Sequence, residues 1–521
     1  MSATTLGTDP TEGIEDSPEL GSRRFFRNVG VIAAAETLSR LKGLVILPLL
    51  TRSLGALNYG VWSQVLLVVT FVPMLMLLGT DGAIVRFLPG MGISLQRRHF
   101  AGWMVSMLGA AAVLGSILYL ARRPVAVVFF GASDEYEQFI PLAAAVIWVN
   151  VLVAGLRNWF RLRNDARLYS AVTVGQALFS LVATIVMLVR HASVYDFVVY
   201  LLLADLVLAG LLAAFVARRD GLARPDFSLM PKFIRFGLPL VPAGFALWGL
   251  NWIDRIFMVQ YSSLRDIGVY SLGYGLGYMG IQVIANPIFA MFPTAAAAEW
   301  DRGRPASVQR LFDHTAWAMV FLMAPLIAGT IVLGPRLIEF LAPPSFSAAA
   351  VIIPITMLGY LFLMLAAYYE VAFGLVQKQW LSTAAVGVAL AVNVPLNFLL
   401  IPPYSLYGAA VATSVAFAAQ LVFVMAVTTR LRTLRTAAAP PVRMVLAAAG
   451  MAGGVWAAGL VVGGGIVGLA VLAMLGVALY FALAVALGAL PRALVPRNLA
   501  EARALLSVPK PETVEVAENT A

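Results

Sequence analysis

Ionisable residues lie inside long apolar stretches at two places in the chain. Glu36 and Arg40 are four residues apart, so they share one face of a helix, and Lys42 lies close by. Asp254 and Arg255 are adjacent in a second apolar stretch, one turn after an asparagine. A charge in hydrocarbon costs at least about 2.5–3.5 kcal/mol, so such residues normally face a cavity or a partner.

The chemistry of these residues suits an anionic ligand. Guanidinium and ammonium groups donate charged hydrogen bonds to phosphate oxygens, so Arg40, Lys42 and Arg255 are candidate anion-binding residues. The alternative is that Glu36 with Arg40, and Asp254 with Arg255, neutralise each other so that insertion into a membrane is tolerated. Both interpretations stay open on the sequence alone.

The densest basic cluster follows another apolar stretch and contains Arg157, Arg161 and Arg163, with aromatic residues among them. Such a cluster is usual on the cytoplasmic side of a membrane protein. The alternative is a vestibule that captures an anionic headgroup. Arg86, at the inner end of an earlier apolar stretch, allows the same two interpretations.

These residues must be positioned by membrane-spanning helices. The 521 residues are 61% hydrophobic and 12% charged, against roughly 45–50% and about 25% in soluble proteins. About 20 mainly apolar residues cross a bilayer. Fourteen such segments are expected near residues 28–50, 59–80, 99–120, 138–157, 169–189, 196–217, 233–259, 267–293, 312–333, 348–372, 381–401, 407–428, 443–462 and 466–489.

The distribution of basic residues predicts the orientation of these segments. With both termini in the cytoplasm, the cytoplasmic tails and loops hold 27 of the 36 Lys and Arg residues. The loops on the other side hold 6, and the remaining 3 lie within spans. This imbalance is the one that the positive-inside rule describes.

Two short sequences occur twice and predict duplicated halves. Tyr59–Ser63 is similar to Ile267–Ser271 at an offset of 208, and Ser170 with Gly175 corresponds to Ser382 with Gly387 at an offset of 212. Duplicated halves in a membrane protein favour a transporter with a pathway between two lobes. The charges do not repeat, since Arg40 aligns with Trp248, so the predicted cavity is asymmetric.

The sequence thus predicts an all-α integral membrane protein of about fourteen transmembrane helices, in two pseudo-symmetric six-helix lobes plus two C-terminal helices. The predicted parts are a disordered cytoplasmic tail (1–27), an N-lobe (28–217), a cytoplasmic interlobe linker (218–232), a C-lobe (233–428), two further helices (429–491) and a cytoplasmic tail (492–521).

Several kinds of site are disfavoured. The chain has no cysteine, and its three histidines are far apart, so no metal site is expected. The glycine-rich run Gly273–Tyr278 lacks the strand that a nucleotide-binding loop would follow. The basic residues lie between apolar segments rather than on one face, which argues against nucleic acid as a partner.

Several motifs resemble one family of membrane transporters. The run Asp254–Phe257 continuing to Gly268–Ser271, with Phe236–Leu240 before it, resembles the start of the second lobe in polysaccharide transporters. These are the O-antigen-type flippases of the multidrug/oligosaccharidyl-lipid/polysaccharide exporter superfamily. Pro402 with Gly408–Thr413, and Leu54–Gly55 with Tyr59–Gly60, are similar to two of its loops.

The resemblance implies a flippase that moves polyprenyl-diphosphate-linked oligosaccharide from the cytoplasmic to the outer leaflet by alternating access, for surface polysaccharide or O-antigen biosynthesis. It implies a multi-pass protein of the bacterial inner membrane that is not an enzyme. Polysaccharide polymerases or glycosyltransferases are the expected partners, besides membrane lipids.

The resemblance also suggests roles for residues. The cavity cations would hold the diphosphate, and Trp248, Asn251 and Trp252 would contact sugar. No cofactor is expected, although Glu36, Asp205 or Asp254 are candidates for coupling to an H⁺ or Na⁺ gradient.

Three other functions stay open. A multidrug/Na⁺ or H⁺ antiporter of the related branch would have a more apolar cavity lined by acidic residues. A flippase for a lipid-linked peptidoglycan precursor would differ in cargo rather than in mechanism. A membrane polysaccharide polymerase would need a long external loop, and the longest one expected here, near residues 121–137, has no supporting acidic or histidine motif.

Overall fold

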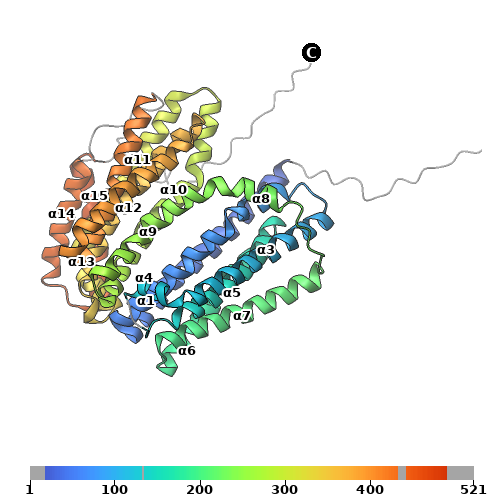
Figure 1. Cartoon of the computed structure of the whole chain (residues 1–521). Coiled ribbons are helices and arrows are strands. Elements are labelled where there is room, and N and C mark those ends of the chain that lie inside the picture. Colours follow the sequence, from blue (N-terminus) through green and yellow to red (C-terminus); the bar gives the residue numbers. More distant parts are fainter. Residues whose placement is uncertain (1–17, 132–133, 432–441, 490–521) are drawn as a thin grey trace, which may run out of the picture. The chain divides into compact units, whose positions relative to one another are not determined.

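The computed structural model describes residues 18–131, 134–431 and 442–489, and between residues 18 and 42 it describes the backbone alone. The described residues form helices and no strand, which confirms the predicted all-α class (Figure 1). The helices are α1 (Pro18–Leu77), α2 (Thr80–Phe87), α3 (Ile93–Leu120), α4 (Arg122–Phe130), α5 (Phe139–Leu162), α6 (Ala166–Arg190), α7 (Val194–Arg219), α8 (Met230–Gly237), η1 (Leu238–Leu240), α9 (Val241–Tyr261), α10 (Leu264–Asp301), α11 (Pro305–Leu341), η2 (Pro344–Phe346), α12 (Ala349–Leu375), α13 (Trp380–Arg430), α14 (Val442–Gly459) and α15 (Gly465–Ala486).

The number of spans agrees with the prediction. Within the described residues, eleven helices are long and apolar enough to cross a membrane. Two of these helices, α1 and α13, are each two limbs joined at a residue with positive φ, Gly55 (φ 66°) and Ser405 (φ 48°). With the second limb of each, and with α9, the described chain has fourteen long helical segments. Helix α9 falls outside the eleven because it carries Asn251, Asp254 and Arg255 in its apolar sequence.

The described chain divides into two compact units. The first contains residues up to Gly275 with Leu341–Ile352 and Ser382–Gln420, and the second contains Leu276–Phe340, Ile353–Leu381 and the residues from Leu421 onward. The division into lobes that the sequence predicts stays a prediction. The predicted cytoplasmic tails fall largely (1–17) or wholly (492–521) outside the described residues.

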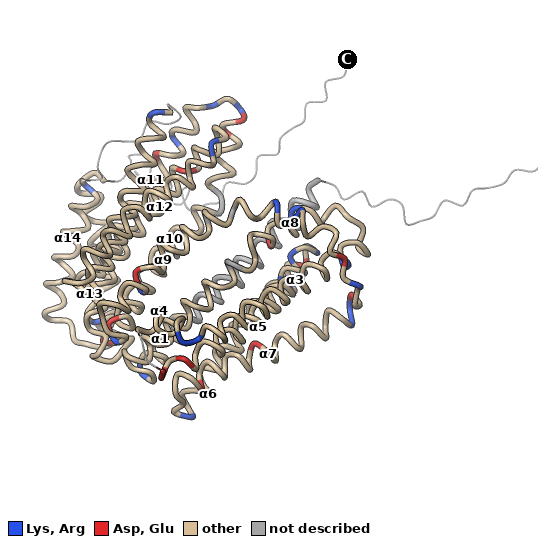
Figure 2. Tube along the Cα trace, in the orientation of Figure 1, with Lys and Arg blue, Asp and Glu red and all other residues tan. Residues whose placement is uncertain are grey.

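The core of the first unit is built around α5, which packs against α3 and α7. Two buried tryptophans on these helices have their indole N–H groups satisfied. Trp103 donates to the Thr80 hydroxyl at 2.9 Å, and Trp159 donates to the Asp220 carboxylate at 2.9 Å. Most charged residues lie at helix ends, and the long helix middles are largely apolar (Figure 2). This arrangement is the one a membrane-spanning bundle requires.

The predicted external loop near residues 121–137 is mostly helical. It contains α4, and the guanidinium groups of Arg122 and Arg123 both bond to the carboxylate of Glu137, with Arg123 at 3.1 Å. Of the three acidic residues in this loop, Glu137 therefore forms an ion-pair cluster that joins the start of α4 to the segment before α5.

The predicted linker docks on the N-terminal part of α3. Between α7 and α8, the Asp226 N–H donates to the Arg98 carbonyl at 3.0 Å, and its carboxylate lies 3.5 Å from the Arg98 guanidinium and 3.8 Å from the His99 imidazole. Gly102 allows this close approach, because a Cβ there would lie 2.2 Å from the Asp226 carbonyl oxygen. The linker is thus attached to the first unit by backbone and side-chain contacts.

The two copies of the repeated sequence pack directly against each other. A Cβ on Gly60 would lie 1.8 Å from the Leu264 carbonyl oxygen, and a Cβ on Gly268 would lie 2.0 Å from the Ala56 carbonyl oxygen. At the offset of 208, Gly60 corresponds to Gly268 and Ala56 corresponds to Leu264. The two contacts are therefore equivalent, as in an interface with two-fold symmetry. Between them, the hydroxyls of Ser63 and Ser271, also 208 apart, are 2.6 Å from each other. Small residues allow this approach of helix backbones in a membrane. We call these residues the copy contact.

Replacing Gly268 by alanine should separate the two helices of the copy contact. The added methyl would overlap a backbone carbonyl, and such overpacking typically costs about 1–3 kcal/mol. The measurement is the thermal unfolding temperature of the purified protein. Gly109→Ala is the matched control, since a Cβ at Gly109 has no neighbour within 4 Å. An unfolding temperature of Gly268→Ala equal to that of the control would contradict the expected overlap.

Acid should loosen the docked linker. Hydrogen bonds from the Ser228 hydroxyl and N–H, with His99 and Arg98 nearby, hold the pKa of the Asp226 carboxyl below its usual range, although burial opposes the shift. A lowered folded-state pKa means that ionised Asp226 stabilises the docked state above about pH 4 and that this contribution is lost as the pH falls further. Hydrogen-exchange protection of the linker should therefore fall below about pH 4 in the wild type. Asp226→Asn should show the low protection already at neutral pH, and equal protection of the two proteins there would refute the role of the carboxylate.

Candidate functional site

A buried ion pair lies in the middle of α9. The side chains of Asp254 and Arg255 are 1% and 4% exposed, and the guanidinium lies 3.3 Å from the carboxylate. The Asp254 carboxylate also accepts the Arg255 N–H at 2.8 Å and the hydroxyl of Tyr270. The two charged groups are paired with each other in this structure, and a role of the pair toward an anionic ligand stays a prediction.

Aromatic rings enclose the guanidinium of Arg255. Its central carbon lies 4.7 Å from the Trp252 ring centroid, 4.9 Å from that of Tyr274 and 5.2 Å from that of Tyr270. Cation–π attraction increases when the cation is desolvated, as it is here. We call Asp254, Arg255 and these rings the buried charge site.

The buried charge site is bonded to the copy contact. The Arg255 Nε donates to the Ser271 hydroxyl at 3.2 Å, and that hydroxyl is the one beside Ser63. The amide of Gln64, next to Ser63, donates to the Arg255 carbonyl at 3.4 Å. The Oε1 atom of Gln64 is buried with no hydrogen-bond partner among the described residues. A change in the ion pair would therefore act directly on the contact between the two repeats.

The predicted sugar-contacting residues lie on α9 beside this site. Trp248 and Trp252 precede Arg255 by seven and three residues, so the three share one helix face. The Trp248 indole N–H approaches the Thr70 hydroxyl at 3.5 Å, and its ring lies 4.5 Å from that of Phe71 on α1. The Asn251 amide donates to its own helix, and the Asn251 carbonyl accepts Arg255 NH1 at 3.1 Å. Direct contact of these residues with sugar stays a prediction.

Four further residues were predicted for the cavity or for ion coupling, and the structure describes the side chain of one of them, Asp205. The side chains of Glu36, Arg40 and Lys42 lie outside the described residues. Asp205 on α7 is half-buried and accepts the Gln176 amide at 3.4 Å, and Gln176 also approaches Asn150 at 3.4 Å. The structure thus places Asp205 in a polar cluster of α5, α6 and α7.

The residues predicted to capture a headgroup have different surroundings. Arg157 is half-buried, lies 5.7 Å from the Tyr169 ring, and has an Nε without a hydrogen-bond partner in the described chain. Arg163 is exposed and lies 5.7 Å from the ring of Trp159. Arg161 and Arg86 are exposed. Headgroup capture by this cluster stays a prediction.

A buried polar pair on α13 escaped the sequence analysis, which followed charged residues. The Asn397 amide donates to the Asn393 side-chain oxygen at 2.9 Å, and Asn393 donates to the Thr413 hydroxyl at 3.3 Å. Both asparagines are completely buried, and the side-chain oxygen of Asn397 has no hydrogen-bond partner within the described part. Their spacing of four residues in an apolar span was the signal that could have identified them.

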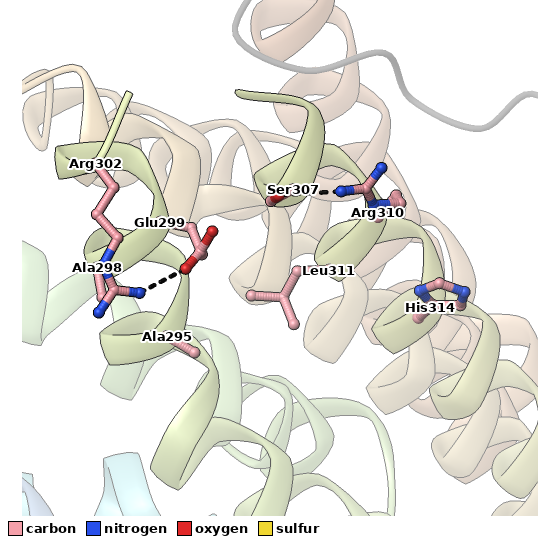
Figure 3. A pocket seen from close by; sticks show the side chains of 8 residues that line it. All are labelled: Ala295, Ala298, Glu299, Arg302, Ser307, Arg310, Leu311 and His314. Carbon is pink, nitrogen blue, oxygen red and sulfur yellow. Dashed lines mark hydrogen bonds and ion pairs between the residues drawn. The ribbon is translucent and has the colours of Figure 1, made fainter. Parts of the chain in front are cut away.

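A pocket of about 410 Å³ lies where α10 ends and α11 begins (Figure 3). Its ionic groups are largely paired, since Arg302 lies 2.6 Å from Glu299, and Arg310 donates to the Ser307 hydroxyl at 3.1 Å. The side chain of His314 lines the same pocket. Among the described residues, no group of His, Asp and Glu is suited to hold a metal ion.

Solved structures with the same fold include a lipid flippase and multidrug transporters. The chain is similar to the lipid II flippase MurJ in an inward closed conformation, with 13% identity, a TM-score of 0.69, and coverage of 87% of this chain and 97% of that one. It is also similar to an inward-facing multidrug resistance MATE family transporter of the MOP superfamily (14% identity, TM-score 0.61, 76% and 98% covered). A Vibrio cholerae MATE transporter gives 14% identity and a TM-score of 0.54, with 79% and 96% covered.

The sequence comparison identifies the family. A search of curated protein sequences gives no significant match. The family model of polysaccharide biosynthesis proteins matches residues 25–299, which is more than half of the chain and includes α9 with the buried charge site. Together with the membrane-transporter fold, this match shows that the chain is a multi-pass membrane protein of the polysaccharide biosynthesis protein family, which confirms the resemblance seen in its motifs.

Proposed function

We propose that the protein is a flippase that moves polyprenyl-diphosphate-linked oligosaccharide from the cytoplasmic to the outer leaflet of a bacterial inner membrane, for surface polysaccharide biosynthesis. Membership of the polysaccharide biosynthesis family carries the proposal. The MurJ and MATE folds support transport as the general activity, and the choice of an oligosaccharide cargo rests on the family. Polymerases and glycosyltransferases that make and use such a cargo are the proposed partners.

The buried charge site is the proposed centre of the transport cycle. Arg255 is enclosed by aromatic rings and paired with Asp254 in this conformation, so a cargo phosphate could reach it only after the enclosing helices move. A diphosphate that replaced Asp254 as the partner of Arg255 would also disturb the Ser271 hydroxyl of the copy contact. Cargo binding and the separation of the two repeats would then be coupled through one side chain.

Ion coupling is proposed at Asp254. Protonation of its carboxylate, or binding of Na⁺ to it, would weaken the bonds from Arg255 and Tyr270. Arg255 would then be released from its partner at the step when it must accept the cargo. Glu36 and Asp205 are further candidates for the same role.

Variants of Asp254 and Arg255 can distinguish a role of the ion pair in transport from a role in folding. Arg255→Ala should abolish surface polysaccharide, because the variant lacks the cation and leaves Asp254 buried without its partner. The double variant Asp254→Asn with Arg255→Gln has no buried charge and should insert at the wild-type level, yet it should still fail to export polysaccharide. The measurements are surface polysaccharide in cells and the amount of protein in the membrane.

Arg336→Ala is the matched control for these variants. Arg336, which is half-buried, also lies in an apolar helix, where it donates to the Gly459 carbonyl at 2.6 Å, and it has no part in the buried charge site. This control should retain surface polysaccharide. Full export by the double variant would show that the pair serves only to neutralise itself, and would count against its role in transport.

Collapse of the driving gradient should stop transport. In inverted membrane vesicles supplied with lipid-linked oligosaccharide, an ionophore that removes the H⁺ or the Na⁺ gradient should reduce translocation to the level of vesicles without the protein. Asp254→Asn should give the same low level with the gradient intact. Translocation that continues unchanged without either gradient would exclude the coupling proposal, and export of drugs in place of oligosaccharide would favour the antiporter alternative.

A further inference from the structure

We infer that the docked linker and the first turn of α3 form a binding site for the phosphate group of an anionic phospholipid. An open depression of about 440 Å³ lies there, lined by Ser94, Arg97, Arg98, Leu222, Ala223 and Arg224. All of these residues belong to the first compact unit. The inference is independent of the proposed cargo, because none of these residues belongs to the buried charge site.

The walls of this depression are held in place by the contacts of Asp226. Its backbone N–H and carboxylate bind Arg98 and approach His99, and its backbone fits against Gly102. These bonds fix the linker residues just before Asp226, which include Arg224, against the start of α3. The arginines of the two segments are therefore brought together by folded structure rather than by chance proximity of mobile chains.

The depression has an excess of positive charge. Its lining contains Arg97, Arg98 and Arg224 and no acidic residue, and the neighbouring carboxylate of Asp226 is shared by Arg98 and His99. The Nε of Arg97 is buried and has no hydrogen-bond partner in the residues that the structure describes. A buried guanidinium N–H without an acceptor is costly, and a phosphate oxygen would satisfy it once the Arg97 side chain turns this atom toward the depression.

The N-terminus of α3 adds to the attraction for an anion. Helix α3 has 28 residues and begins at Ile93. Its N-cap residue is Gly92, which has no side chain that could cap the N–H groups of the first turn. Ser94, in that first turn, lines the depression. Helix N-termini bind phosphate through their N–H groups and dipole. The helix end and the arginines thus select the same chemical group.

The rim of the depression favours a lipid over a free phosphate ion. Leu222 lines the site with 92% of its surface exposed, and Phe227, on the same linker, is 48% exposed. Exposed apolar side chains beside arginines match a headgroup that continues into acyl chains. In the predicted orientation, the loop before α3 and the linker are both cytoplasmic, on the side where anionic lipids attract basic segments.

Ser94→Asp tests the site without weakening the helix. The added carboxylate would repel a phosphate, while an acidic residue in the first turn is favourable for a helix. The experiment is native mass spectrometry of the purified full-length protein in neutral detergent, with phosphatidylglycerol and with phosphatidylcholine of the same acyl chains. The wild type should prefer phosphatidylglycerol, and Ser94→Asp should weaken its tightest binding by at least about tenfold with no fall in the unfolding temperature.

Two further variants make the result specific. Arg97→Gln with Arg224→Gln leaves the Arg98–Asp226 pair intact and should lose the same preference. The control variant Arg302→Gln, Arg304→Gln and Arg310→Gln removes three charges around the connection between α10 and α11 and should keep the preference for phosphatidylglycerol. If the control lost the preference for phosphatidylglycerol to the same extent, net charge alone would explain the effect, and the proposed site would be overturned. Wild-type affinity in Ser94→Asp, or displacement of the lipid by an equal concentration of inorganic phosphate, would overturn the lipid assignment.

Discussion

The burial of a guanidinium and a carboxylate side by side in an apolar helix constrains much of the first unit. Such a pair is tolerated only when each remaining donor and acceptor has a partner. Arg255 meets this requirement with groups from its own helix and from α10, including the Tyr270 and Tyr274 rings and the Ser271 hydroxyl. Helix α9 must therefore stay in register with α10, and it must also stay close to α1, where Gln64 donates to the Arg255 carbonyl.

The copy contact provides the close approach that this arrangement needs. Because Gly60 and Gly268 have no side chains, the backbones of α1 and α10 come near enough for the two serines between them to share a hydrogen bond. The buried charge site thus lies next to a contact between small residues, which allow helix backbones to approach closely in a membrane.

Much of the fold could be predicted from the sequence, and much of the site could not. Runs of apolar residues are enough to define the fourteen segments, since the bilayer fixes their length. The charged residues of α9 were recognisable because they are costly in hydrocarbon. The enclosure of Arg255 depends on which helices meet, so Tyr270, Tyr274 and Gln64 carried no signal of their own. The asparagines of α13 were missed because an amide is a weaker signal than a charge, and α4 was missed because its nine residues are too few to span.

The copy contact also has a consequence for how the chain arose. Ser63 meets Ser271, which holds the corresponding position in the other repeat, and the contacts of Gly60 and Gly268 exchange roles between the copies. A residue meets its own counterpart only on a two-fold axis. If the repeats arose by duplication, the present contact is the interface that a homodimer of half-length chains would have had. Positions away from that axis would then be free to differ between the copies, as Asp254 differs from its counterpart Ile46.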